Sequence, residues 1–144
     1  MTSANKAGLA AENMIADLLR RHHCEFLRQV PLDRSVYGHR IRADFLVENI
    51  EEFPHGLVIE SKWQDRYGTT DEKFPYVVEN ILAGGYGPHA VLVVATGGGH
   101  RAGAIEWLRM RVDGDRLIGV FSFEDLLSWV QRSIHVRIMS LIFE

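Results

Sequence analysis

The chain has 144 residues, of which 47% are hydrophobic and 24% are charged, and its formal net charge is −3. This length and composition predict a single compact domain spanning residues 1–144. There is no run of 18 apolar residues and no apolar leader, so we expect a soluble, cytoplasmic protein. The single cysteine, Cys24, excludes an intramolecular disulfide. The negative net charge gives no general electrostatic reason to bind nucleic acid.

The chain begins with an amphipathic segment. Apolar residues recur at spacings of three and four from residue 7 to residue 22, which predicts a helix with Glu12 at the edge of its buried stripe. Residues 25–30 are expected to form a short strand that ends before Pro31. Residues 41–48 alternate apolar and polar side chains, which predicts a half-buried strand with Asp44 on its polar side.

Residues 57–62, with the sequence LVIESK, form the most informative segment. Side chains two apart on a strand share a face, so Glu60 and Lys62 are expected to point the same way. The polar stretch 48–55 is typical of a turn between antiparallel strands, and such a hairpin brings Asp44 beside Glu60. Two carboxylates and an amine in one place suit hydrolysis of a phosphodiester around Mg²⁺, a cation that prefers hard oxygen ligands.

The second half of the chain continues the alternation of helices and strands, which favours an α/β fold with a mixed central sheet flanked by helices. No linker or internal repeat interrupts it. The segment 135–143 is compatible with a last strand or with a continued helix. The other expected elements are a helix at 71–83 closed by Gly84 and Gly85, a covered strand at 90–95, a helix at 102–112, a strand at 117–121, and a helix to Arg132 that starts with a capping box of Ser122 and Asp125.

The order of Glu12 on a helix, Asp44 on a strand and Glu60-Ser61-Lys62 on the next strand resembles the PD-(D/E)xK nuclease superfamily, which includes restriction endonucleases, resolvases and repair nucleases. One feature departs from the motif, because Asp44 follows Ala43 where the family name expects proline. The resemblance implies a restriction-endonuclease-like core and a Mg²⁺-dependent endodeoxyribonuclease, with Mn²⁺ as a substitute ion. An E-x-K triplet alone occurs by chance in many proteins, so the order of all the acids carries the prediction.

The resemblance also implies roles for individual residues. Asp44, Glu60 and the Ser61 carbonyl would be metal ligands, Glu12 would support metal binding, and Lys62 would be the catalytic lysine. Gln64 lies two residues after Lys62, so on a continued strand it would share the face of Glu60 and Lys62. Some members carry a glutamine there, which makes it a fifth catalytic candidate. The residues expected to contact DNA are Arg40, Arg42, Arg66, Lys73 and Arg101.

Several alternatives remain open from the sequence. The arginine-rich stretch 20–42 is either a phosphate-tracking patch or an ordinary solvated surface. The activity is either a restriction- or homing-type endonuclease or a Holliday-junction resolvase, the latter favoured by the small size and the segment 6–12. A non-enzymatic alternative is an inactive DNA-binding or assembly module of the same fold. Because each chain supplies one site, cleavage of both strands favours a homodimer or a higher homo-oligomer.

Overall fold

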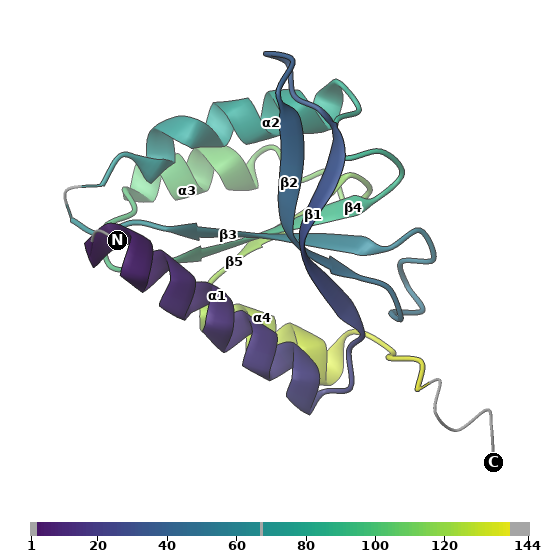
Figure 1. Cartoon of the computed structure of the whole chain (residues 1–144). Helices are drawn as coiled ribbons and strands as arrows, with labels where there is room; N and C mark the ends of the chain where they lie inside the picture. The colour runs from purple at the N-terminus through teal and green to yellow at the C-terminus, as the bar shows by residue number, and fades with distance from the viewer. Residues whose placement is uncertain (1–2, 67, 139–144) are drawn as a thin grey trace.

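The computed structural model describes residues 3–66 and 68–138. Its centre is a five-stranded mixed sheet, in which the strands lie side by side in chain order (Figure 1). The first two strand pairs in this order are antiparallel, and the last two pairs are parallel. The α/β class with a mixed sheet is therefore confirmed. The strands are β1 (Phe26–Arg34), β2 (Arg40–Val47), β3 (Leu57–Trp63), β4 (Ala90–Thr96) and β5 (Leu117–Phe121).

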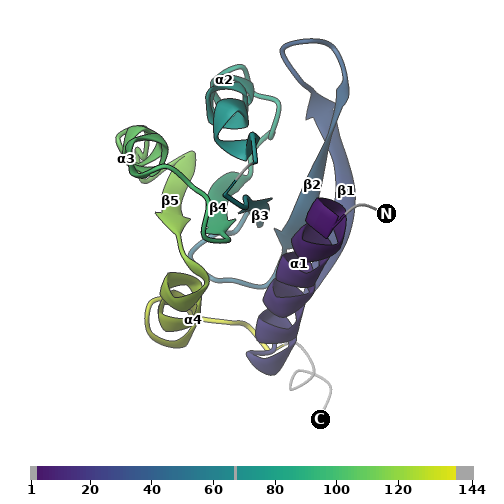
Figure 2. The ribbon, with the colours of Figure 1, turned by 90° about the vertical axis from the view of Figure 1, so that its left-hand side faces the viewer.

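Helices cover both faces of the sheet. α1 (Ser3–Arg21) and α4 (Phe123–Arg132) lie on one face, and α2 (Phe74–Leu82) and α3 (Ala102–Arg109) lie on the other (Figures 1 and 2). The two parallel connections of the sheet run through α2 and α3, as parallel pairing requires. No helix in the described ranges is long and apolar enough to cross a membrane.

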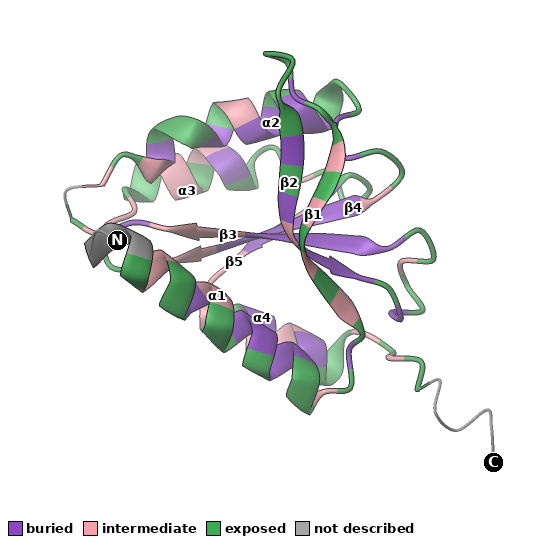
Figure 3. Cartoon of the chain, viewed as in Figure 1, coloured by how far each residue is buried: buried purple, intermediate pink, exposed green. Residues whose placement is uncertain are grey.

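Each face of the sheet has its own hydrophobic core. Buried positions lie along the strands and along the helices that cover them (Figure 3). β3 supplies both cores by alternation, since Ile59 packs toward α1 and α4 while Val58 packs toward α2 and α3. Glu60 continues the Val58 side of the strand. A carboxylate therefore stands where the pattern of the strand would place an apolar residue.

The β1–β2 hairpin forms one edge of the sheet and is strongly twisted, so that it runs across the direction of β3 and β4 (Figure 1). On β2, Ala43 packs in the core under α2, whereas Phe45 packs in the core under α1, although strand alternation puts both side chains on one side. On β1, Gln29 lies opposite Asp44 and has a positive φ of 54°, a conformation that non-glycine residues rarely adopt. The twist thus changes at the position that carries the candidate acid.

Several predicted boundaries differ from the structure, among them the helix expected at 102–112, which ends at Arg109. β1 continues through Pro31 to Arg34, because an edge strand tolerates the missing N–H of proline. The helix expected from residue 71 begins as a 3₁₀ helix (Thr70–Lys73), and α2 starts only at Phe74, with Pro75 in its first turn. In the expected segment 135–143, Val136 forms an isolated bridge with Ile50, and residues 139–143 lie outside the described residues.

Candidate functional site

Asp44 and Glu60 lie side by side on β2 and β3, as the predicted hairpin requires. The Asp44 N–H donates to Glu60 Oε1 at 2.9 Å, and the Ser61 N–H donates to Asp44 Oδ2 at 2.8 Å. Glu60 is only 5% exposed, and its second oxygen accepts from the Tyr86 hydroxyl at 3.1 Å. The two carboxylates are therefore held by backbone groups of each other's strands.

Glu12 approaches the same place from α1. The Gln29 side-chain nitrogen donates to Glu12 Oε1 at 3.1 Å and to Asp44 Oδ1 at 3.4 Å. One amide nitrogen thus lies between two carboxylate oxygens that come from different elements. Arg28, next to Gln29 on β1, has its guanidinium 3.9 Å from Glu12 Oε1 and covers the ring of Phe45.

Burial raises the pKa of all three acids, and the charge of Asp44 adds to the shift of Glu12 and Glu60. Burial, and then the charge of Asp44, raise the pKa of Glu60 to about 7. Burial also raises the pKa of Asp44, and burial followed by the Asp44 charge raises that of Glu12. The Lys62 ammonium acts on all three acids in the opposite direction. Burial thus disfavours the charged form of all three acids in this structure.

Lys62 lies at the junction of two hollows. The larger, of about 630 Å³, lies between the start of α1 and the end of β3, and Glu12 also lines it. The smaller, of about 200 Å³, lies toward α2, and Glu60 and Tyr86 line it. The lysine thus borders both the hollow that contains Glu12 and the hollow that contains Glu60.

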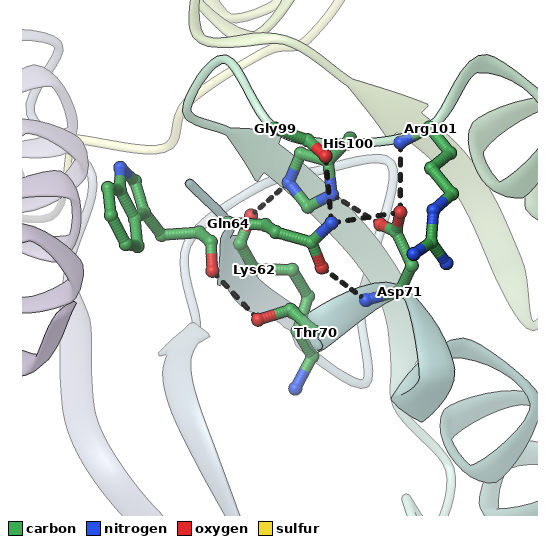
Figure 4. A network of polar contacts seen from close by, with 8 residues as sticks. Lys62, Gln64, Thr70, Asp71, Gly99, His100 and Arg101 are labelled. Atoms are coloured by element: carbon green, nitrogen blue, oxygen red, sulfur yellow. Dashed lines mark hydrogen bonds and ion pairs between the residues drawn. The ribbon is translucent and has the colours of Figure 1, made fainter. Parts of the chain in front are cut away.

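A buried polar network holds the chain directly after β3 (Figure 4). The Gln64 side-chain nitrogen donates to Asp71 Oδ2 at 3.0 Å and to the Gly99 carbonyl at 2.8 Å, and its oxygen accepts from the Asp71 N–H at 2.6 Å. The Arg101 N–H also donates to Asp71 Oδ2, at 2.8 Å. Gln64 is only 2% exposed, and the hydrogen bonds of its amide connect the loop after β3 to the loop after β4.

His100 connects this network to the backbone of Lys62. Its Nδ1 lies 2.7 Å from Asp71 Oδ1, and its Nε2 lies 3.0 Å from the Lys62 carbonyl oxygen. The imidazole ring therefore bridges the Asp71 carboxylate and the backbone of Lys62. Burial works to raise the pKa of Asp71, but the hydrogen bonds from Arg101, His100 and Gln64 outweigh it and lower that pKa. The pair fixes the strand end while the Lys62 side chain points away from the network (Figure 4).

A comparison with protein-family models matches residues 3–134 to the PD-(D/E)XK nuclease superfamily domain. The chain belongs to this superfamily. The match covers both strands that carry the candidate acids and all four helices. Comparisons with curated proteins and with solved structures found no match.

Nucleases of this superfamily generally use divalent metal ions, and the donor set of this PD-(D/E)XK domain fits such an ion. Glu12 and Asp44 direct hard oxygen atoms at a single point, which the Gln29 amide nitrogen takes in this structure. Glu60 is adjacent, but both of its oxygens accept hydrogen bonds. Among residues 3–66 and 68–138, no three acidic, histidine or cysteine side chains form a complete ligand cluster. The three acids named from the sequence thus lie close together, but their side chains do not all point at one common position.

The cationic residues named from the sequence lie in three places around the nuclease domain. Arg40 and Arg42 are exposed on the β1–β2 hairpin. Lys73 lines the larger hollow, and Arg66 is exposed on the loop that leaves β3. Arg101 is exposed at the start of α3. The structure therefore distributes them around the acids instead of gathering them into one patch.

Several residues of the site were not identified from the sequence. Gln29 lies on an expected strand and gives no signal until its contact with Asp44 is known. Tyr86 follows the glycines that close α2, far along the chain from Glu60. Asp71 was expected only as the start of a helix, although it is the centre of the buried network. A polar residue in an otherwise ordinary loop reveals such a role only through its partners.

Proposed function

We propose that the protein is a metal-dependent DNA endonuclease that uses Mg²⁺, with Mn²⁺ as a substitute. One observation carries this proposal: Glu12 and Asp44 direct their oxygens at the same atom, beside Glu60 and Lys62, in a chain of the PD-(D/E)XK nuclease superfamily. The intact set of acids and lysine favours an active enzyme over an inactive binding module.

Each residue has a distinct role in this proposal. A bound divalent cation polarises the phosphoryl group and makes its water ligand more acidic. Asp44, Glu60 and the Ser61 carbonyl hold the ion, and Glu12 completes its anionic surroundings. Lys62 orients the attacking water and stabilises the negative charge that develops on the phosphate. Gln64 supports Lys62 through the buried network, since its amide has no free group to offer the substrate.

Cleavage of plasmid and linear duplex DNA by purified variants tests the assignment. Asp44→Ala and Lys62→Ala are each expected to lower the Mg²⁺-dependent rate by at least roughly 100-fold, because each removes a group that stabilises the transition state. Glu106→Ala is a matched control, since it removes an exposed carboxylate of α3. Wild-type rates in either site variant, with folding verified by circular dichroism, would reject the assignment.

The type of substrate and the assembly state are separate parts of the proposal. Cutting both strands with one site per chain is simplest for a symmetric dimer, which sedimentation measurements test. A Holliday-junction resolvase would cut four-way junctions in preference to linear duplex of the same sequence. The residues proposed to contact DNA phosphates are Arg40, Arg42, Arg66, Lys73 and Arg101, and their loss should reduce the salt dependence of binding.

A further inference from the structure

The tip of the β1–β2 hairpin carries an aromatic side chain in an unusual setting. Tyr37 is 77% exposed, yet its ring is stacked on Tyr76 of α2, with centroids 5.3 Å apart and an interplanar angle of 15°. One face of the Tyr37 ring is therefore covered by a parallel ring, and the exposure of the side chain leaves the opposite face to solvent. A planar molecule can continue this stack from the outside.

The hairpin tip is built to hold Tyr37 in place. The buried Asn80 side chain of α2 accepts from the Val36 N–H at 2.9 Å, which ties the tip to the helix. Within the tip, the Ser35 hydroxyl accepts from the Tyr37 N–H at 3.3 Å, and the Ser35 carbonyl accepts from the Gly38 N–H at 2.9 Å. Little conformational freedom is left to lose when a ligand stacks on the ring.

The same hairpin is positively charged. Arg34, Arg40 and Arg42 are exposed, and their guanidinium groups bond to backbone carbonyl oxygens of the hairpin itself. In the described part of the chain, none of the three forms an ion pair with a carboxylate. Backbone carbonyls orient these groups without neutralising them, so the hairpin attracts an anion from outside.

A hollow connects this surface to the candidate active site. The smaller hollow is lined on the hairpin side by Ser35, Arg40 and Tyr76. It is also lined by Glu60 and Lys62 of the candidate site. A chain of phosphates that follows Arg40 and Arg42 along this hollow reaches Glu60 and Lys62. A ligand with both a flat aromatic group and a polyanionic backbone fits the stack, the charge and the direction of the hollow together.

We propose that the Tyr37–Tyr76 pair is a stacking platform for one unpaired DNA base, and that the hairpin arginines bind the phosphates on either side of it. This proposal rests on the proposed nuclease function, because it names the substrate class of that same site. A base within a duplex presents its faces to neighbouring bases, so a base that stacks on Tyr37 must be unpaired or at an end. The preferred substrate is then DNA with an unpaired nucleotide near the cleaved bond.

Binding without cleavage tests the platform. The probes are a short duplex with one unpaired 2-aminopurine and the same duplex fully paired, measured in EDTA by fluorescence anisotropy and by quenching of the 2-aminopurine. The wild-type protein is expected to bind the unpaired probe roughly 5- to 150-fold more tightly and to quench it, as stacking on one aromatic ring does. Tyr37→Leu should lose both effects, whereas the control Tyr37→Phe should keep both.

The outcomes separate the platform from the nuclease. Equal wild-type affinity for the two probes, or an unchanged preference in Tyr37→Leu, would overturn the platform. Arg40→Gln should weaken binding of both probes by the same factor, because phosphate contacts carry no information about pairing. Lys62→Ala should lose cleavage but keep the preference for the unpaired probe, because Lys62 lies in the hollow and not on the stacked rings. Quenching that depends on Tyr37 in a protein that cleaves no DNA would support the platform and refute the proposed function.

Discussion

Glu60 is a nearly buried acid beside a second carboxylate, and this environment determines how the metal-free protein responds to pH. Its folded-state pKa of about 7 lies above the ordinary value of 4.5 for a glutamate, so the folded state holds the proton more tightly than the unfolded chain. Stability from this group is present below about pH 4.5 and is lost as the pH rises through 7. Above pH 7 the ionised carboxylate destabilises the fold.

Replacement of Glu60 by glutamine is therefore expected to stabilise the metal-free protein at pH 8 and to give little or no gain at pH 5. The glutamine oxygen can still accept from the Asp44 N–H, and its amide can donate to the Tyr86 oxygen. Thermal unfolding of Glu60→Gln and wild type in EDTA at the two pH values measures the difference. An equal shift in melting temperature at both pH values would contradict this account of Glu60.

Gln29 stands between Glu12 and Asp44 where two carboxylates direct their oxygens at one atom. Its amide donates to both acids and competes with a cation for them. Gln29→Leu keeps the side-chain size but removes the donor, so we expect Mn²⁺ to bind on the order of tenfold more tightly, as loss of a hydrogen bond to a charged group implies. Titration calorimetry measures this affinity without any cleavage assay.

A second variant, Gln29→Gly, distinguishes the effect of the side-chain amide from that of the backbone conformation at this position. Glycine adopts the observed φ of 54° freely, so it removes the donor and also relieves the strained conformation. Both variants should bind Mn²⁺ more tightly than the wild type if the amide is the competitor. Weaker binding in both would instead identify the Gln29 side-chain oxygen as a ligand.

The loop after β4 packs tightly against the loop that follows Lys62. A Cβ added at Gly99 would lie 1.7 Å from the Asp65 carbonyl oxygen, whereas one added at Gly98 would have no neighbour within 4 Å. Gly99→Ala is therefore expected to destabilise the fold by about 1–3 kcal/mol or more, because backbone has to move. Gly98→Ala, one residue earlier, should stay within about 0.5 kcal/mol of wild type. Urea unfolding of the two variants compares them, and equal stability would refute the close packing.

The sequence predicts local elements of this fold better than the contacts between them. Alternation and a polar turn predict the β2–β3 hairpin, and with it the adjacency of Asp44 and Glu60, because both signals are short-range. The glycine run 97–99 gives no such signal, since glycines carry no side chain that indicates what the loop packs against. His100 and Asp71 lie 29 residues apart, and their pairing exists only after the sheet has formed.

Net charge describes this molecule poorly as a whole. The formal charge of −3 gives no reason to expect contact with a polyanion, yet the hairpin presents three exposed arginines while the acids cluster at the end of β3. Within the arginine-rich stretch 20–42, two arginines form ion pairs with acids of the same chain. Arg20 pairs with Asp17, and Arg28 pairs with Glu12. Which of these arginines remain without an acidic partner depends on the folded structure, which composition cannot show.

The repulsion among Glu12, Asp44 and Glu60 predicts that divalent ions stabilise the entire domain. An ion that binds only the folded chain adds about 2.7 kcal/mol at a concentration 100 times its dissociation constant. For a domain of this size, that corresponds to a rise of roughly 5–10 °C in melting temperature, which EDTA should reverse. Thermal scans of wild type and Asp44→Asn with increasing Mg²⁺ and Mn²⁺ measure the effect. The variant, which lacks the acid shared by both pairs, should respond little, and an equal rise in it would show that the ions bind elsewhere.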